Sequence, residues 1–223
     1  FTLNFNRSRT KVTDLYANEP FVRIGGFDEI ATVAAKGETL GAIYGRTYVR
    51  NAQGEIQHNS YGEPEMNVEL TKIGDPTPDF VLSLVTDFDI HKRFNFSFTM
   101  KLSAGGDRIN LTRAMLEHYG ISGEKTLATF PQAQSYGIFE DFIESATYFS
   151  IPNLTISYDF IHNKRVGWFT NLRVAASAKN LVFASAYKGT PTSLLFGYPS
   201  AAGLDLYNLP LIRNYSLSLM VNF

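Results

Sequence analysis

The sequence predicts an all-β fold in which antiparallel strands form part of a transmembrane β-barrel. Segments of about ten residues recur in which apolar and polar side chains alternate, so that each strand has one apolar face and one polar face. The connections between them are alternately short and long, the asymmetry of outer-membrane barrels. The chain also contains 18 Phe and 12 Tyr but one Trp, and Phe and Tyr favour strands.

Two strands are expected near the start of the chain. Residues 1 to 9 alternate from the first residue onward, so the sequence is expected to open in mid-strand. Gly41–Val49 carries adjacent apolar residues between glycines and gives the second expected strand. The connection between them, residues 10–40, is long although a barrel needs a short turn there, and the pattern alone supplies no physical reason.

The third and fourth segments, Phe80–Ile90 and Phe94–Leu102, flank the short turn 91–93 and show the clearest alternation. The side chains of the fourth segment expected to face lipid are Phe94, Phe96, Phe98, Met100 and Leu102, and those expected to face a wet lumen are Asn95, Ser97, Thr99, Lys101 and Ser103. Phenylalanines on one side and a lysine on the other fit a strand between lipid and water.

The fifth and sixth segments are Tyr148–Phe160 and residues 172–187. The sixth begins with apolar residues on one side, and its phase slips near Lys179–Asn180. Beyond the slip, Leu181 and Phe183 carry the apolar pattern. A phase slip inside a long strand predicts a β-bulge.

The seventh segment, Asn214–Phe223, is predicted to be the closing strand of the barrel. Its apolar face consists of Tyr215, Leu217, Leu219, Val221 and Phe223. We interpret this face, with a phenylalanine at its end, as a barrel-assembly signal at the periplasmic rim.

Seven strands are an incomplete set. Single-chain bacterial barrels use even numbers from eight upward, and an open sheet edge in lipid leaves costly unpaired backbone groups. We therefore expect further strands upstream of residue 1. The long connections, residues 50–78, 104–146 and 188–212, would then form extracellular loops on one rim, and the short turns 91–93 and 161–170 would lie on the other.

Composition excludes several functions. The formal net charge of −1 excludes the basic surface of a nucleic-acid-binding protein, so no nucleic-acid partner is expected. The absence of cysteine excludes disulfides and thiolate metal sites. The sequence contains no apolar run of about 18 residues, so it predicts no membrane-spanning helix. Barrel strands are half polar and cross a membrane without such a run.

Four stretches resemble, in the same order, motifs of SusC/RagA-type TonB-dependent transporters. Lys36–Gly45 resembles G-x-P-x-G-x-F-Y-G, and Ile73–Phe80 resembles I-G-N-P-x-P-x-F. Phe142–Tyr158 resembles F-I-E-x-x-S-Y-L-R-L-K-N-L-T-L-G-Y, and Leu172–Leu181 resembles L-R-V-Y-x-S-G-Q-N-L. The four stretches occur in the same order as in the family and together extend over most of the chain, so the resemblance is specific. The sequence departs from it at Pro152 and lacks the family's acidic loop before I-G-N-P, so no calcium site is expected there.

The resemblance implies that residues 1–223 form the C-terminal part of a barrel of about 22 strands, integral to the bacterial outer membrane. The plug, the TonB box and the first strands would lie outside the chain. It implies TonB-energised import of oligomeric nutrients, either glycans or peptides, with a SusD-like surface lipoprotein as lid. The implied partners are this lipoprotein, TonB, membrane lipids and the substrate. No enzymatic activity, catalytic residue or cofactor is expected.

The binding candidates are aromatic residues of two long loops, whose flat rings can stack on sugars or pack on apolar peptide side chains. They are Phe130, Tyr136, Phe139, Phe196, Tyr198 and Tyr207, as contacts to substrate or lid. For each of them, packing of one loop on another is the alternative.

Two groups of polar residues are expected to have no catalytic or metal-binding role. Asp87 and Asp89 project to one face and are close enough for a carboxylate pair, but they lie beside a predicted periplasmic turn. Solvated charge in the lumen explains them better. The four histidines are far apart in sequence and lack partners at ligand spacing, so no metal site is expected.

Two alternatives stay open from the residues alone. A smaller outer-membrane barrel with an enzymatic or structural role needs one more strand. A soluble all-β binding module also contains half-buried strands, but the phenylalanine face of residues 94–102 and the terminal Phe223 argue against it.

Overall fold

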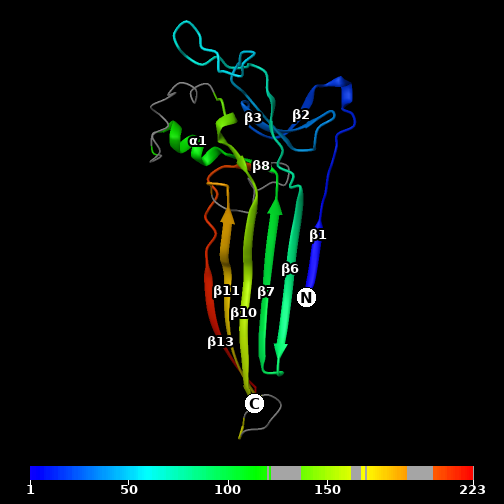
Figure 1. Cartoon of the computed structure of the whole chain (residues 1–223), viewed down its shortest axis with the longest axis vertical. Coiled ribbons are helices and arrows are strands. Elements are labelled where there is room, and N and C mark those ends of the chain that lie inside the picture. The colour runs from blue at the N-terminus through cyan, green and yellow to red at the C-terminus, as the bar shows by residue number, and fades with distance from the viewer. Residues whose placement is uncertain (120, 122–136, 162–166, 169, 190–202, 223) are drawn as a thin grey trace.

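The computed structural model describes residues 1–119, 121, 137–161, 167–168, 170–189 and 203–222. Figure 1 shows a tall sheet of long strands with a group of shorter elements at one end. We call the tall sheet the wall; it comprises residues 2–6, 80–104, 148–161, 171–185 and 214–222. We call the described residues 7–79, 105–147 and 186–213 the cap.

The wall is a six-stranded antiparallel sheet with the strand order β1-β6-β7-β10-β11-β13. Its strands are β1 (Thr2–Asn6), β6 (Phe80–Ile90), β7 (Phe94–Ala104), β10 (Tyr148–Ile161), β11 (Asn171–Ser185) and β13 (Asn214–Asn222). Each strand lies beside the wall strand that precedes it in the chain. The predicted all-β, antiparallel class is confirmed.

The two faces of the wall differ as predicted. Directly paired residues on neighbouring strands share a face, and Leu82, Leu102 and Phe149 are paired in turn across three strands. This row continues the apolar face from strand to strand. On the opposite face, Lys101 pairs with both Ser83 and Ser150.

One predicted wall strand lies elsewhere. The strand within Gly41–Val49 is β4 (Ala42–Gly45), which belongs to a four-stranded cap sheet with β2 (Phe21–Gly26), β3 (Ile30–Ala35) and β5 (Thr71–Gly74). Ala42 and Ile43 are adjacent and both fully buried, so this strand has neither a lipid face nor a wet face. Such a continuous apolar run is typical of a strand inside a core. Among the described residues the wall therefore has six strands, and the prediction that Gly41–Val49 is one of its strands is wrong.

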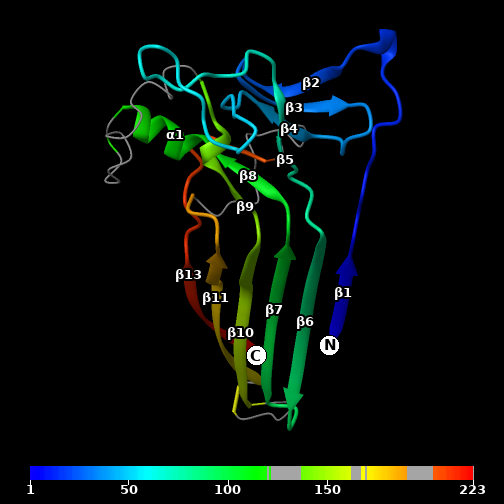
Figure 2. The same cartoon turned by 45° about the horizontal axis from the view of Figure 1, so that its top comes forward.

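This change also accounts for residues 10–40. Strand β1 pairs directly with β6, where Leu3 lies opposite Leu84. Residues 7–79 are therefore one long connection between these two strands, on the same end of the wall as the other long connections (Figures 1 and 2). The short turn at residues 91–93 lies at the opposite end, which is the asymmetry of a barrel with long loops on one rim.

The cap also contains a three-stranded sheet in the order β12 (Leu204–Asp205), β8 (Asp107–Asn110) and β9 (Ile143–Ser145). Beside it lie the helix α1 (Leu111–His118) and the short 3₁₀ helix η4 (Glu140–Phe142) (Figure 2). A second 3₁₀ helix, η1 (Tyr16–Asn18), belongs to the segment between β1 and β2. The main core cluster is in the cap and consists of Ile30, Ile43, Ile109, Leu111, Ala114, Phe142 and Leu204. Among the described residues, no helix has the length and apolar character needed to cross a membrane.

Candidate functional site

A stacked aromatic pair lies on the polar face of the wall, at the end next to the cap. The ring centroids of Tyr148 and Phe183 are 5.3 Å apart and their planes differ by 19°. The ammonium of Lys101 lies 5.7 Å from the centroid of the Tyr148 ring. All three side chains are half-buried, so each has surface left for a ligand. An aromatic pair next to a cation can stack on flat groups and attract polar ones.

A shift in strand register places these rings. The register between β10 and β11 shifts between Ile151 and Asn153, opposite Val182 and Lys179. Asn180 has a φ of 53°, in the left-handed region. An irregularity therefore lies near Lys179–Asn180, where the bulge was predicted, but β11 keeps its phase across it, because Ala178 and Val182 pair with Leu154 and Ile151 on the apolar face.

The predicted side of Phe183 is wrong. Phe183 pairs with Ser150, and Ser150 pairs with Lys101 on the polar face. The reason is that the exchange of faces occurs in β10. Ser150 and Asn153 are three residues apart, but their partners in β7, Lys101 and Thr99, are two residues apart, so β10 contains one extra residue. Pro152 lies inside this irregularity, which suits a residue that cannot donate to the strand ladder. Sequence reasoning missed the pair because it assigned the slip to β11.

The far end of the polar face carries paired charges. The Arg173 guanidinium donates to both carboxylate oxygens of Asp159, at 2.5 and 2.8 Å, and Asp159 is buried. The Asn95 amide donates to Asp87 at 2.5 Å and to Asp89 at 3.0 Å. The two aspartates thus share one amide donor beside the short turn, at the end away from the cap.

Glu144 of β9 joins three separate parts of the cap. Its Oε1 accepts from the Arg113 guanidinium at 3.1 Å and from the Asn110 amide at 3.4 Å, and its Oε2 accepts from the backbone N–H of Lys188 at 2.7 Å. Arg113 also donates to the buried Glu117 at 2.8 Å. Glu144 is the acidic residue of the F-I-E stretch, so the motif has a structural role.

A second buried group holds the segment that follows β11. The Tyr187 hydroxyl donates to the Asp205 carboxylate, and both residues are buried. Asp205 also accepts from the Asn208 amide at 2.5 Å, and the Arg108 guanidinium lies 5.2 Å from the centre of the Tyr187 ring. Burial, followed by the hydrogen bond to Asp205 and its charge, raises the pKa of Tyr187 well above its usual range.

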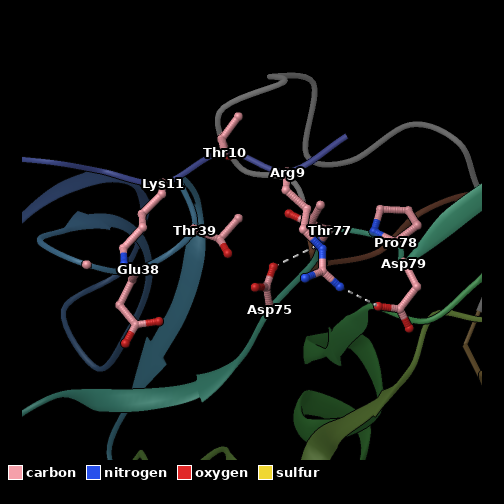
Figure 3. A pocket seen from close by; sticks show the side chains of 10 residues that line it. Arg9, Thr10, Lys11, Glu38, Thr39, Asp75, Thr77, Pro78 and Asp79 are labelled. Carbon is pink, nitrogen blue, oxygen red and sulfur yellow. Dashed lines mark hydrogen bonds and ion pairs between the residues drawn. The ribbon is translucent and has the colours of Figure 1, made fainter. Parts of the chain in front are cut away.

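A polar pocket of about 470 Å³ lies where the 7–79 connection leaves β1 and returns to β6 (Figure 3). Its lining residues are Arg9, Thr10, Lys11, Gly37, Glu38, Thr39, Asp75, Thr77, Pro78 and Asp79. Arg9 Nη2 is 3.7 Å from Asp79 Oδ1, and the Thr77 N–H donates to Asp75 Oδ1 at 3.0 Å. Burial alone would raise the pKa of Asp75, but hydrogen bonds from Thr39 and Thr77 outweigh it and lower that pKa. The pocket joins charges of both signs. Most of its lining residues belong to the two motif stretches Lys36–Gly45 and Ile73–Phe80, but the sequence analysis assigned none of them to a binding site.

The aromatic loop candidates divide into two groups. Phe139 is half-buried and packs against the main core cluster. Tyr207 is exposed, and its backbone N–H donates to Thr112 Oγ1 at 2.6 Å. The other four, Phe130, Tyr136, Phe196 and Tyr198, lie outside the described residues, as does Phe223 of the terminal strand.

The terminal strand and the histidines can be placed in the same way. Tyr215, Leu217 and Leu219 are exposed on the apolar face of β13, and Val221 is half-buried. His58 lies in the cap and His91 in the short turn after β6. Among the described residues, no three metal-ligating side chains gather into a group that could hold a metal ion.

Comparison with known proteins gives a consistent result. The TonB-dependent receptor P3 of Formosa agariphila is 23% identical over 263 residues, which cover 99% of this chain and 26% of the receptor. A structure of the RagAB peptide transporter superposes with a TM-score of 0.62 at 17% identity, over 99% of this chain and 27% of the transporter chain. The resemblance to SusC/RagA-type TonB-dependent transporters is confirmed.

Two further comparisons define the extent of this likeness. The RagAB peptide importer in its open-open state superposes with a TM-score of 0.64 at 15% identity, over 99% of this chain and 26% of the importer chain. No protein-family model matches the chain. The chain thus spans about a quarter of the length of the proteins it resembles, and its fold is that of a segment of a RagA-type barrel. These relatives are a receptor and transporters rather than enzymes.

Proposed function

We propose that this chain forms the C-terminal part of the barrel wall, with its extracellular loops, of an outer-membrane importer of oligomeric nutrients. The observation that carries the proposal is the wall, a long antiparallel sheet with one apolar face, one polar face and all long connections at one end. A sheet with lipid on one side and a wet lumen on the other needs these features. The likeness to TonB-dependent transporters supports the same function.

In this proposal the apolar face meets lipid and the polar face lines the import path. The cap forms the outer rim, where a SusD-like surface lipoprotein docks as a lid, and TonB energises import through a plug outside this chain. The name of the RagAB peptide transporter favours peptides, and glycans are the alternative substrate class. Tyr148, Phe183 and Lys101 are proposed to contact the oligomer on its way through the lumen. The aromatic loop residues, Phe139 and Tyr207 among them, are proposed as further substrate or lid contacts.

Cysteine labelling of the full-length transporter in outer membranes tests the orientation of the wall. Ser97 and Thr99 lie on the polar face of β7, and Phe98 lies between them on the apolar face. We expect Ser97→Cys and Thr99→Cys to react with a small hydrophilic maleimide and Phe98→Cys to stay unlabelled, because only the polar face meets water. Equal labelling at all three positions would exclude a lipid-facing wall.

Uptake by the full-length transporter tests the aromatic pair. Replacing Phe183 by alanine removes one stacked ring, and aromatic pairs contribute about 0.5–1.5 kcal/mol beyond the area they bury. We expect Phe183→Ala to raise the KM for the transported oligomer about two- to tenfold. Tyr148→Phe, which keeps both rings, is the matched control. Unchanged uptake of labelled peptides and of labelled glycans by Phe183→Ala would remove the pair from the import path.

A further inference from the structure

We infer that the apolar face of the wall holds a binding groove for one acyl chain of a phosphate-bearing membrane lipid. The groove has a volume of about 360 Å³ and lies over β11, between side chains of β10 and β13. The inference rests on the proposed function, because it requires this face to meet lipid. The lipid would occupy a defined site, in contrast to the solvating lipid around the rest of the barrel.

The register of three strands forms the groove. Leu154, Ala178 and Tyr215 are paired in turn across β10, β11 and β13. Ile156, Ala176 and Leu217 form the next row in the same way. In both rows a small alanine lies between two large side chains, so the alanines form a floor and the larger residues form two walls.

The groove runs along the strands. Its two rows are two residues apart, which is about 7 Å along a strand. The next row away from the cap has Val174 in place of an alanine, between Tyr158 and Leu219, so the floor rises there. Because barrel strands cross the bilayer, a groove parallel to them follows the direction in which lipid acyl chains extend.

The surface of the groove suits hydrocarbon. Ser177 and Ser216, which lie between the two rows, are paired in register, and their hydroxyl oxygens are 2.7 Å apart. Their side chains alternate with those of the alanines, so this hydrogen bond lies on the polar face of the sheet. The lining side chains left on the apolar face are alanine, leucine, isoleucine and one tyrosine, and they favour an apolar ligand.

The cap end of the groove provides a cation for a phosphate. Arg213 is exposed and directly precedes β13, two residues before Tyr215 at the cap end of the groove. The Asn180 amide donates to the Ile212 carbonyl at 3.0 Å and fixes this segment against β11. A guanidinium matches phosphate geometry well, and tyrosine is enriched at the membrane interface. The chain thus supplies an apolar groove with a positive charge beside its outer end.

Photo-crosslinking in vesicles tests the groove. The full-length transporter is reconstituted with a phosphatidylglycerol whose acyl chain carries a diazirine, and crosslinked peptides are mapped by mass spectrometry. We expect strong labelling of the β11 and β13 peptides, and we expect Ala176→Leu to reduce it to the level of the surrounding apolar face. Ala175→Leu is the matched control, because Ala175 pairs with Ser157 and Ser218 on the polar face. It is expected to leave labelling unchanged.

A second probe tests the headgroup. Phosphatidylcholine with the same acyl chain carries no net charge, and Arg213→Gln is expected to lower phosphatidylglycerol labelling to the phosphatidylcholine level. Three results would overturn the groove: even labelling along the apolar face, labelling that Ala176→Leu does not change, and crosslinks from these strands to a second copy of the protein. Labelling of the polar face at Ser97 or Thr99 would instead contradict the proposed membrane orientation.

Discussion

At the scale of single residues, buried polar groups determine how the cap is held together. Glu144 connects α1, β8 and the segment after β11 through three donors. The Tyr187–Asp205 pair connects that same segment to β12. The sequence marked Glu144 as part of a motif but could not show its partners, because Arg113 and Lys188 are far from it in the chain and hydrogen bonds leave no periodic signal.

Tyr187 gives the cap a stability that depends on pH. Its pKa in the folded protein is raised above the value of about 10 for an unperturbed tyrosine. Above about pH 10 the unfolded cap loses this proton while the folded cap keeps it, so stability is fully present below that pH and falls as pH rises. We expect proteolytic cleavage of the cap in the proposed full-length transporter to accelerate between about pH 10 and pH 11.

The variant Tyr187→Phe separates this effect from general alkaline damage. It removes the titrating hydroxyl but keeps the ring beneath Arg108. We expect the variant to be cleaved faster than the wild type at neutral pH, because Asp205 loses a hydrogen bond, and to show a weaker increase above about pH 10. If the cleavage rate rises equally above about pH 10 in the wild type and in the variant, a group other than Tyr187 controls the alkaline unfolding of the cap.

At the scale of elements, the length and regularity of a strand decided how well the sequence predicted it. Strand β7 alternates without a break from Phe94 to Ala104, and its apolar and polar side chains lie on opposite faces of the wall, as predicted. Strand β10 contains an extra residue near Pro152, and the faces beyond it could not be assigned because a one-residue slip exchanges them. Strand β4 is short and buried, and a short apolar run does not reveal which sheet it joins.

The irregularity opposite Pro152 can be tested through Asn180. Its φ of 53° is strained for a residue with a branched Cβ, and its amide donates to the Ile212 carbonyl. We expect Asn180→Val to lower the free energy of unfolding by about 2–3 kcal/mol, from the strained backbone and the lost hydrogen bond together. Asn180→Gly removes the hydrogen bond alone and is expected to cost about 1 kcal/mol. Urea unfolding of the full-length transporter in vesicles measures both, and equal costs would show that the backbone is not strained.

At the scale of the whole molecule, the sequence predicted the wall better than the cap. Alternation of apolar and polar residues indicates which side chains share a face of a strand, and this pattern is repeated in the wall strands. The cap is held by contacts such as Arg108 on Tyr187 and Phe139 on the main core cluster, which no local pattern encodes. For the same reason, neither the polar pocket near Arg9 nor the Tyr148–Phe183 pair could be found from the sequence.

The outer strands of the wall make a prediction about the chain as a separate molecule. Among the described residues, β1 pairs only with β6 and β13 pairs only with β11, so each has one edge without a partner strand. Both strands also carry exposed apolar side chains, among them Phe5 and Leu217. Unpaired edges and exposed apolar faces promote aggregation in water. We expect residues 1–223, produced alone, to aggregate in aqueous buffer.

Detergent micelles should cover the apolar face but leave the two edges open. In micelles we therefore expect a β-rich circular-dichroism spectrum, with unfolding at lower temperature and less cooperativity than for the full-length transporter, whose closed barrel would have no open edge. Analytical ultracentrifugation in buffer without detergent is the decisive measurement. A monodisperse chain of 24.9 kDa that unfolds cooperatively there would mean that the apolar face does not need lipid and would favour a soluble all-β module.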